Sequence, residues 1–510
     1  MTLAIRRAVF LLTTLLCASS AAYAQPVSLS AEGIGQVLIY PYYTVRNGWT
    51  TLLSIVNNDS VNGKAVKVRF LEGKNGASVA SFNLFLAPDD IWTGAVVPGS
   101  SDTKGARLIS NDDSCTTPSF RSLQTLIAAP PPSIEFSNQT YVADGDLPAL
   151  QTIDRTREGY IEVIEMASIP LDRDAPSALQ RQIYSLATGS YRRAPCDAVN
   201  DVDLPLYMTQ ISPPSGGLSG AATLVNVVGG ASTEYTPVAL NGFWLTLPTT
   251  TTTLAPQLTA SNSPLPNLSS GANTTSQYVH DGKTYVSRFT RSIDAVSATL
   301  MSLELLGEHA YTKDGIIGTT WIVSMPTKKF YTQSAATLPF SRAWDRNVGV
   351  ACDAVIFRSF DRNAVIPVIS DDFGTRPPAP PAPTLCYSTV AVSFGGVTAR
   401  GTELLFGSAN ALPFNGAQNL GSDVPSSGKE GGKTRLIPIF SAASLVSAGG
   451  SITTVDAITG QLTTAFGPHT LYGLPMIGVA FSQSAFKTGN PQQNYASGFR
   501  LQSTRRITTP

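Results

Sequence analysis

Closely spaced aspartates are the residues of this chain whose type and spacing could hold a metal ion. Asp144 and Asp146 flank a glycine, and Asp201 and Asp203 flank a valine, each in a segment predicted to be a loop. Ca²⁺ takes about six to eight oxygen ligands, and such a pair can supply two of them. Aspartate is equally common in ordinary turns and helix caps. The pattern leaves two interpretations: calcium bound by these four residues, or turns in a protein without a cofactor.

The signals for catalysis are weak. None of the three histidines, His280, His309 and His469, has the HxH or HExxH spacing of metal ligands. Ser426–Lys429 (SSGK) and Lys487–Gly489 (KTG) match two motifs of penicillin-binding enzymes, which place the serine at the start of a core helix. This serine lies in a polar, glycine-rich segment, and no SDN motif lies between the two matches. We interpret the match as chance and predict no catalytic residues and no enzymatic activity.

Two tryptophans could bind sugars. Trp49 and Trp92 lie in a region that also contains Tyr40, Tyr42 and Tyr43. Exposed aromatic rings can contact the faces of sugars, whereas aromatic residues in β-sandwiches commonly fill the core. The sequence therefore allows either glycan contact by Trp49 and Trp92 or packing inside the protein.

The N-terminal segment has the pattern of an export signal. Residues 1–24 contain Arg6 and Arg7, an apolar run at 8–16 and the small-residue site Ala22-Tyr23-Ala24. As a helix the run would span about 14 Å, whereas a bilayer core needs about 30 Å. We therefore predict a signal peptide, a mature chain beginning at Gln25, and no transmembrane span. The expected location is secreted, either extracellular or at the cell surface, with the periplasm as an alternative.

The four cysteines beyond residue 24 are expected to form disulfides, because exported proteins meet oxidising conditions. They allow three connectivities. We favour Cys115–Cys196 and Cys352–Cys386, since each pair lies within one half of the chain. The close CxxC spacing of a zinc site is absent.

Composition excludes two broad classes of protein. Lys+Arg and Asp+Glu are both 35, and charged residues make up only 14% of the chain. A nucleic-acid-binding protein needs a basic excess, and a disordered chain needs high charge with low hydrophobicity. Without residues 1–24, which hold two arginines and no acids, the balance is 33 minus 35, or −2. Such a low charge gives little electrostatic repulsion between molecules.

The hydrophobic pattern predicts a mainly β protein built of immunoglobulin-like β-sandwich modules with a few short helices. In residues 65–71, Val66, Val68 and Phe70 alternate with Lys67 and Arg69, as in a strand with one face exposed. The expected units are a sandwich module at 25–110, a second β-rich module with short helices at 111–246, a Thr/Ser/Pro-rich linker or long loop at 247–276, and a C-terminal β-rich module at 277–510 with a proline-rich loop at 375–384.

Several phrases of the sequence resemble a family of exported proteobacterial proteins that has no assigned activity. They include GQVLIYPYYTV, LAPDDIWTGAV, REGYIEVIEM and TTWIVSMPTKKFY, and together they span residues 35–331. The resemblance implies a secreted or surface-exposed, β-rich protein. It implies no catalytic residue and no cofactor.

These observations favour a secreted or cell-surface protein with a structural or interaction role. Its expected partners are copies of itself or a cell-surface polymer, and not nucleic acid. An extracellular carbohydrate-binding protein is the alternative, and a secreted hydrolase whose site no linear motif reveals is a third. The sequence leaves open the ligand, the oligomeric state and the disulfide connectivity.

Overall fold

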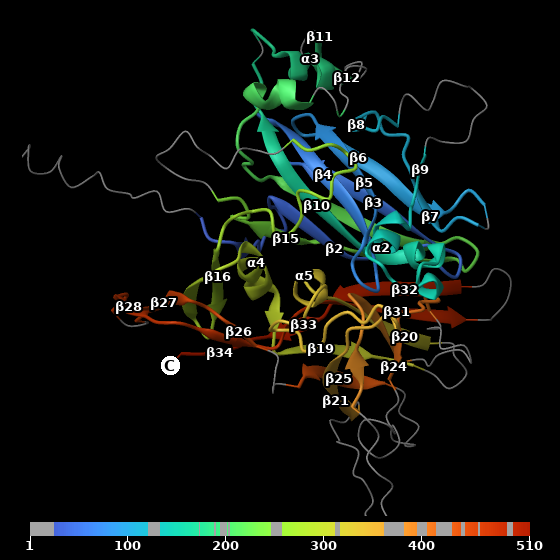
Figure 1. Ribbon diagram of the computed structural model, residues 1–510, viewed down its shortest axis with the longest axis vertical. Helices are drawn as coiled ribbons and strands as arrows, with labels where there is room; N and C mark the ends of the chain where they lie inside the picture. Colours follow the sequence, from blue (N-terminus) through green and yellow to red (C-terminus); the bar gives the residue numbers. More distant parts are fainter. Residues whose placement is uncertain are drawn as a thin grey trace, which may run out of the picture.

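The computed structural model describes residues 25–509 apart from 102, 121–132, 173, 188–189, 194–200, 202–203, 246–257, 312–316, 362–381, 395–404, 415–430, 440–443, 457–458 and 487–492. The predicted signal peptide, the SxxK and KTG matches, Cys196, Asp203 and most of the proline-rich loop lie outside these residues. The fold is mainly β, which confirms the predicted class. Strands from the N-terminal half and from the C-terminal half form two adjoining parts of one body (Figure 1).

A seven-stranded antiparallel sheet lies at the centre of the protein. Its strands in spatial order are β1 (Ser28–Leu29), β15 (Val238–Asn241), β2 (Val37–Thr44), β10 (Glu158–Ile169), β4 (Gly63–Glu72), β5 (Ser78–Leu86) and β8 (Cys115–Thr117). Every residue of β2, β4 and β10 is buried, so both faces of the sheet centre are covered.

A six-stranded antiparallel sheet packs against one face of the seven-stranded sheet. Its strands in spatial order are β14 (Ala231–Tyr235), β13 (Leu218–Asn226), β3 (Trp49–Asn57), β6 (Ile91–Pro98), β7 (Ala106–Ile109) and β9 (Ser133–Glu135). Val66, Val68 and Phe70 of β4 meet Leu53 and Ile55 of β3 in the shared core. The alternating pattern of β3 and β13 leaves the other face of this sheet towards solvent.

The C-terminal half adds four further sheets of three or more strands. The first contains, in spatial order, β16 (Thr275–His280), β17 (Lys283–Arg288), β27 (Gly449–Val455) and β28 (Leu462–Phe466), and the second β22 (Thr384–Leu385), β21 (Asp353–Asp361), β25 (Gly432–Pro438), β19 (Glu304–His309) and β33 (Gln502–Thr504). The third contains β24 (Ala411–Pro413), β23 (Thr389–Ser393), β20 (Ile317–Ser324), β31 (Ile477–Phe486) and β32 (Gln493–Arg500). The fourth contains β26 (Ser444–Val446), β29 (Thr470–Tyr472) and β34 (Arg506–Thr508). Two short pairs complete the β structure, β11 (Tyr184–Ala187) with β12 (Ser190–Arg193) and β18 (Met301–Ser302) with β30 (Leu474–Pro475).

The described helices are short. They are α2 (Gln139–Ala143), α3 (Ala178–Ile183), α4 (Ser292–Leu300), α5 (Lys329–Thr332) and the 3-10 turns η1 (Pro148–Leu150), η2 (Ile153–Arg157) and η3 (Leu204–Gln210). From Ile293 to its end α4 is buried on all sides, because it packs between the seven-stranded sheet and the C-terminal strands. Within the described residues, no helix combines the length and apolar character needed to cross a membrane.

One continuous core joins the two halves. Val37 and Ile39 of β2 and Ile164 of β10 share a hydrophobic cluster with Trp321 and Val323 of β20. Both large sheets also contain strands from 25–110 and strands from 111–246. The predicted boundary between residues 110 and 111 is therefore corrected: it falls inside a single sandwich, because β10 inserts between β2 and β4.

The charged face of β4 differs from the prediction of a half-buried strand. Lys67 and Arg69 are buried, as are Val66, Val68 and Phe70 on the opposite face. The expectation is wrong because alternation of polar and apolar residues reports only that two faces differ. It does not report whether another part of the chain covers the polar one.

One of the two predicted disulfides is present. Cys352, just before β21, is bonded to Cys386, just after β22, and the two strands pair between them. The partner predicted for Cys115 lies outside the described residues, so the Cys115–Cys196 bridge stays a prediction.

Candidate functional site

Several charged side chains of β4 and β10 are buried inside the protein, among them Lys64, Arg69, Glu162 and Glu165. Arg69 lies directly opposite Glu162 in the strand register, and the guanidinium and carboxylate are 2.6 Å apart. Burial raises the pKa of Glu162, against the opposing effect of Arg69. This pair is an internal ion pair and does not face solvent.

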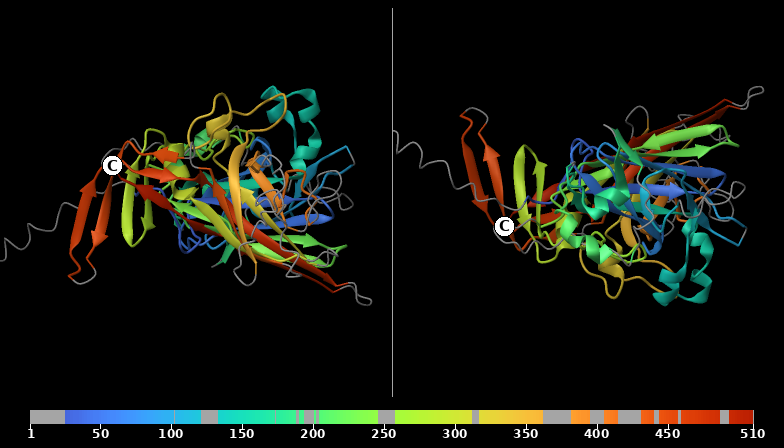
Figure 2. Two further views of the ribbon diagram at one scale, coloured as in Figure 1. Left: turned by 90° about the horizontal axis from the view of Figure 1, so that it is seen from below. Right: turned by 90° about the horizontal axis from the view of Figure 1, so that it is seen from above.

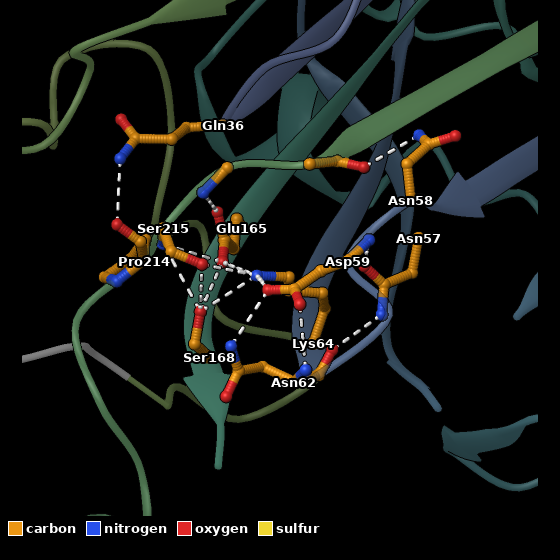
Figure 3. A network of polar contacts seen from close by, with 12 residues as sticks. Gln36, Asn57, Asn58, Asp59, Asn62, Lys64, Glu165, Ser168, Pro214 and Ser215 are labelled. Carbon is orange, nitrogen blue, oxygen red and sulfur yellow. Dashed lines mark hydrogen bonds and ion pairs between the residues drawn. The ribbon is translucent and has the colours of Figure 1, made fainter. Parts of the chain in front are cut away.

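Lys64, near the start of β4, is the centre of a second cluster (Figure 3). Its ammonium group lies 2.9 Å from Asp59 Oδ2 and 3.3 Å from Glu165 Oε1. It also donates hydrogen bonds to Ser168 Oγ at 3.0 Å and Ser215 Oγ at 2.6 Å. Lys64 is fully buried, whereas Ser215 is exposed, so the cluster reaches the surface at this serine.

The carboxylate of Glu165 is held by donors from the crossing segment at 215–216 and by Ser168 of its own strand, β10. The backbone N–H groups of Ser215 and Gly216 donate to it at 3.1 and 2.7 Å, and Ser168 Oγ donates at 3.0 Å. Burial raises the pKa of Glu165, although Lys64 and these donors act in the opposite direction.

Asp59 completes the cluster from the loop that follows β3. Burial alone would raise the pKa of Asp59, but hydrogen bonds from Lys64 and from the backbone N–H groups of Val61 and Asn62 outweigh it and lower the pKa well below its ordinary value. Asp59 is therefore a carboxylate at neutral pH.

A serine beside a lysine can be a nucleophile if the lysine is neutral and takes the hydroxyl proton. The geometry at Ser215 does not favour this, because the Lys64 nitrogen donates a hydrogen bond to Ser215 Oγ and lies beside two carboxylates. The cluster instead ties together the 57–62 loop, the end of β10 and the segment at 214–217. No local motif could have predicted it, since its members come from three distant parts of the sequence: residues 59–64, 165–168 and 215–216.

Lys67 lies on the covered face of β4, away from the Lys64 cluster. Its ammonium donates to the carbonyl oxygens of Ala260 at 2.6 Å and Ser261 at 3.1 Å. Burial lowers the pKa of Lys67 to about 7, with Asp201 opposing the shift and Arg69 reinforcing it. Residues 258–261, which lie within the predicted linker or long loop at 247–276, are thus bound to the central sheet.

The predicted calcium ligands bind to neighbouring groups in the protein. Asp146 forms an ion pair with Arg155 at 2.7 Å and accepts a hydrogen bond from Trp344 Nε1 at 2.8 Å. Asp144 instead pairs with Lys329 at 3.0 Å. The two carboxylates pair with cations from different segments, and calcium binding by Asp144 and Asp146 stays a prediction.

Asp201 is also engaged, because it accepts hydrogen bonds from the backbone and hydroxyl of Ser261 at 2.9 and 2.6 Å. Asp203 lies outside the described residues. Across the described part of the chain, no three His, Cys, Asp or Glu side chains gather as a metal site would need.

The two tryptophans predicted to contact glycans are core residues. Trp49 is 1% exposed and packs on Phe406, while Trp92 is 0% exposed and packs on Phe82. The glycan-contact prediction is therefore corrected. Alternation along β3 and β6 turns both rings towards the seven-stranded sheet, where they fill the sandwich.

The three histidines lie in separate places. His280 pairs with the neighbouring Asp281 at 3.3 Å. His309 lies in β19 and stacks on Phe394. His469 Nδ1 lies 2.7 Å from Ser287 Oγ, and burial lowers the pKa of this histidine.

The outer face of the six-stranded sheet carries a shallow hollow of about 400 Å³. Its lining consists of small, uncharged or aliphatic residues: Leu52, Leu53, Ser54, Thr93, Gly94, Ala95, Ile109, Ser110, Asn111, Ala221 and Thr223. Leu52 is exposed at its rim, and the nearby Ile91 is exposed as well. A binding partner can cover an uncharged surface of this kind at a low cost in free energy, because no charged group has to lose its hydration.

Comparison with known proteins returned no match to a family model, to a curated protein or to a solved structure.

Proposed function

We propose that this chain is a secreted or cell-surface protein that acts by binding and assembly, and not by catalysis. The observation that carries the proposal is the contrast between its two kinds of surface. The charged groups of β4 and β10 are paired inside the protein, whereas the outer face of the six-stranded sheet offers small uncharged and aliphatic side chains around a hollow. The signal pattern at residues 1–24 and the Cys352–Cys386 disulfide support export to an oxidising compartment.

The binding part of the proposal is tested by adding charge to the hollow. Thr223→Lys places an ammonium on the outer face, and Val228→Lys adds the same charge in the β13–β14 turn outside the hollow. We expect intact cells that express the wild-type protein to retain it at their surface, where added protease degrades it. Thr223→Lys should release protein into the medium, and Val228→Lys should not. Wild-type protein found entirely free in the medium as a monomer would contradict the proposal.

The non-catalytic part is tested at Ser215, which is the exposed serine nearest a lysine ammonium in the Lys64 cluster. A fluorophosphonate probe labels serines whose hydroxyl is activated by a base. We expect no labelling of the wild-type protein at neutral pH, because the Lys64 nitrogen is the donor, and Ser215 Oγ the acceptor, of the hydrogen bond between them. Labelling that disappears in Ser215→Ala would overturn this part and favour a hydrolase.

A further inference from the structure

The hairpin formed by β27 and β28 stands at the outer margin of the protein. Figures 1 and 2 both place it beyond β16 and β17, away from the large sandwich. β28 is the edge strand of its sheet, and all five of its residues are exposed. Leu462 is 66% exposed and Phe466 is 85% exposed.

The open edge of β28 has a defined set of unpaired backbone groups. Asp456 N–H donates to Gln461 O at one end of the hairpin, and Gly467 N–H donates to Gly450 O at the other. Because bonded and non-bonded pairs alternate in an antiparallel ladder, Thr463 and Ala465 direct their N–H and C=O groups to β27. Leu462, Thr464 and Phe466 therefore direct theirs outwards.

The other edges of the described sheets of three or more strands are protected by familiar means. Edges at β1, β8, β9, β22, β26, β33 and β34 are two or three residues long, and β24 ends in a proline. β14 and β32 lie against each other, and β16 is bridged by Val27. Short, proline-containing or covered edges prevent unwanted strand pairing. β28 has five residues, no charged side chain and, within the described residues, no covering segment.

We propose that β28 pairs with β28 of a second copy of this chain, in antiparallel orientation about Thr464. This pairing rests on the proposed function, since it specifies how copies of the protein would assemble. Residues with outward backbone groups would face each other: Thr464 against Thr464 of the second copy, and Leu462 against Phe466. The aliphatic–aromatic pair is a favourable cross-strand contact, and no like charges meet.

The sheet face next to β28 also supports pairing with a second copy of this chain. Val455, Thr453 and Ser451 are the β27 partners of Leu462, Thr464 and Phe466, and they continue the same uncharged face of the sheet. On β17 and β16 the same face carries Val286 and the exposed Val279. Two copies joined at β28 would share one continuous sheet with this face on one side. The net charge of −2 without residues 1–24 opposes such an approach only weakly.

The test is sedimentation velocity of the chain from Gln25 onward across the micromolar concentration range. We expect the wild-type protein to form a dimer as its concentration rises. Thr464→Lys and Thr464→Glu should each weaken dimerisation about tenfold or more, because like charges would face each other. An equal mixture of the two variants should restore the dimer. Thr464→Val, which keeps the N–H group and the β-propensity, is the matched control and should dimerise as the wild type does.

Thr464→Pro tests the backbone contact separately. It removes an outward N–H group and none of the β27 bonds, so the far-ultraviolet circular dichroism should be unchanged while the dimer is lost. A wild-type protein that stays monomeric, or a Thr464→Lys variant that dimerises normally, would overturn the pairing. Either result can occur while the protein still binds the cell surface, in which case the proposed function stands and only this interface fails. If the protein dimerises through β28 but never associates with cells, this interface stands and the proposed function fails.

Discussion

At the scale of single residues, the main feature is a set of charges enclosed by the fold. Taking a charge out of water costs several kcal/mol unless a partner replaces the lost hydration. Lys64 meets this requirement with two carboxylates and two hydroxyls, whereas within the described residues the hydrogen bonds of Lys67 go to two carbonyl oxygens. Lys67 is therefore the residue at which protonation should most affect stability.

Lys67 should make the protein more stable as the pH rises above neutrality. The pKa of Lys67 is lowered to about 7, from an ordinary value near 10.5, so the folded state binds fewer protons than the unfolded state between these values. Stability therefore increases with pH in this window, by about 2 kcal/mol between about pH 7 and pH 9. Lys67→Met should abolish this increase in urea-unfolding measurements, while Lys104→Met, at an exposed lysine, should preserve it. An identical pH profile for wild type and Lys67→Met would disprove the assignment.

The Arg69–Glu162 pair should be costly to break and easy to replace. Arg69→Met leaves a buried carboxylate without its cation and should lower the free energy of unfolding by about 3–5 kcal/mol. Within the described part of the chain, Arg69 Nε and Glu162 Oε1 have no hydrogen-bond partner. Replacing both residues, as in Arg69→Met with Glu162→Leu, should therefore recover most of the loss.

The difference in stability between Arg69→Met and the double variant is measurable as a coupling energy in a double-mutant cycle. Arg69→Met should also lose stability as the pH rises, because burial raises the pKa of Glu162 and the folded state then binds the extra proton. A double variant as unstable as Arg69→Met alone would show that the site needs the ion pair itself.

At the scale of elements, β21 and β22 depend on a covalent link. Only two residue pairs join these strands in register, and the Cys352–Cys386 bond lies next to them. The bond closes a loop with a sequence separation of 34 residues. A loop of this size restricts the unfolded chain considerably. The bond should therefore contribute more to the free energy of unfolding than the two-residue pairing of β21 with β22 does.

Replacing both cysteines with serine should lower the free energy of unfolding by about 3–4 kcal/mol, on the loop-entropy model. That is a large part of the roughly 5–15 kcal/mol typical of a folded domain. Guanidinium unfolding of the double variant and the wild type under non-reducing conditions measures the difference. Equal unfolding midpoints would mean that packing of the flanking strands already restrains this loop.

At the scale of the whole molecule, the seven-stranded sheet is an internal layer. One face packs on the six-stranded sheet and the other on the C-terminal half, so β2, β4 and β10 have no solvent-facing side. Antiparallel sheets commonly keep one face in water. Covering both faces makes the N-terminal half dependent on the C-terminal half for its stability.

A fragment of residues 25–245 should therefore fail to reach a rigid native state. Separation would expose Val37, Ile39 and Ile164 together with the charged side of β4. We expect the fragment to bind a hydrophobic dye and to lack near-ultraviolet circular dichroism, whereas the chain from Gln25 should unfold in one cooperative transition. A fragment that unfolds cooperatively by itself would show that the N-terminal sandwich is an independent domain.

The sequence alone predicted the mainly β class and the run of strands, because alternation and turn residues are local properties, and it favoured the Cys352–Cys386 pair among three possible connectivities. It also identified the two sides of β4 by their chemistry. Only the tertiary structure decided what covers each side, since Lys67 meets Ala260 and Arg69 meets Glu162 across long stretches of chain. The same limit explains Trp49, Trp92 and Asp146: residue type shows what a side chain can bind, and the packed fold decides which partner it reaches. The Lys64 cluster and the open edge of β28 are likewise properties of distant segments brought together.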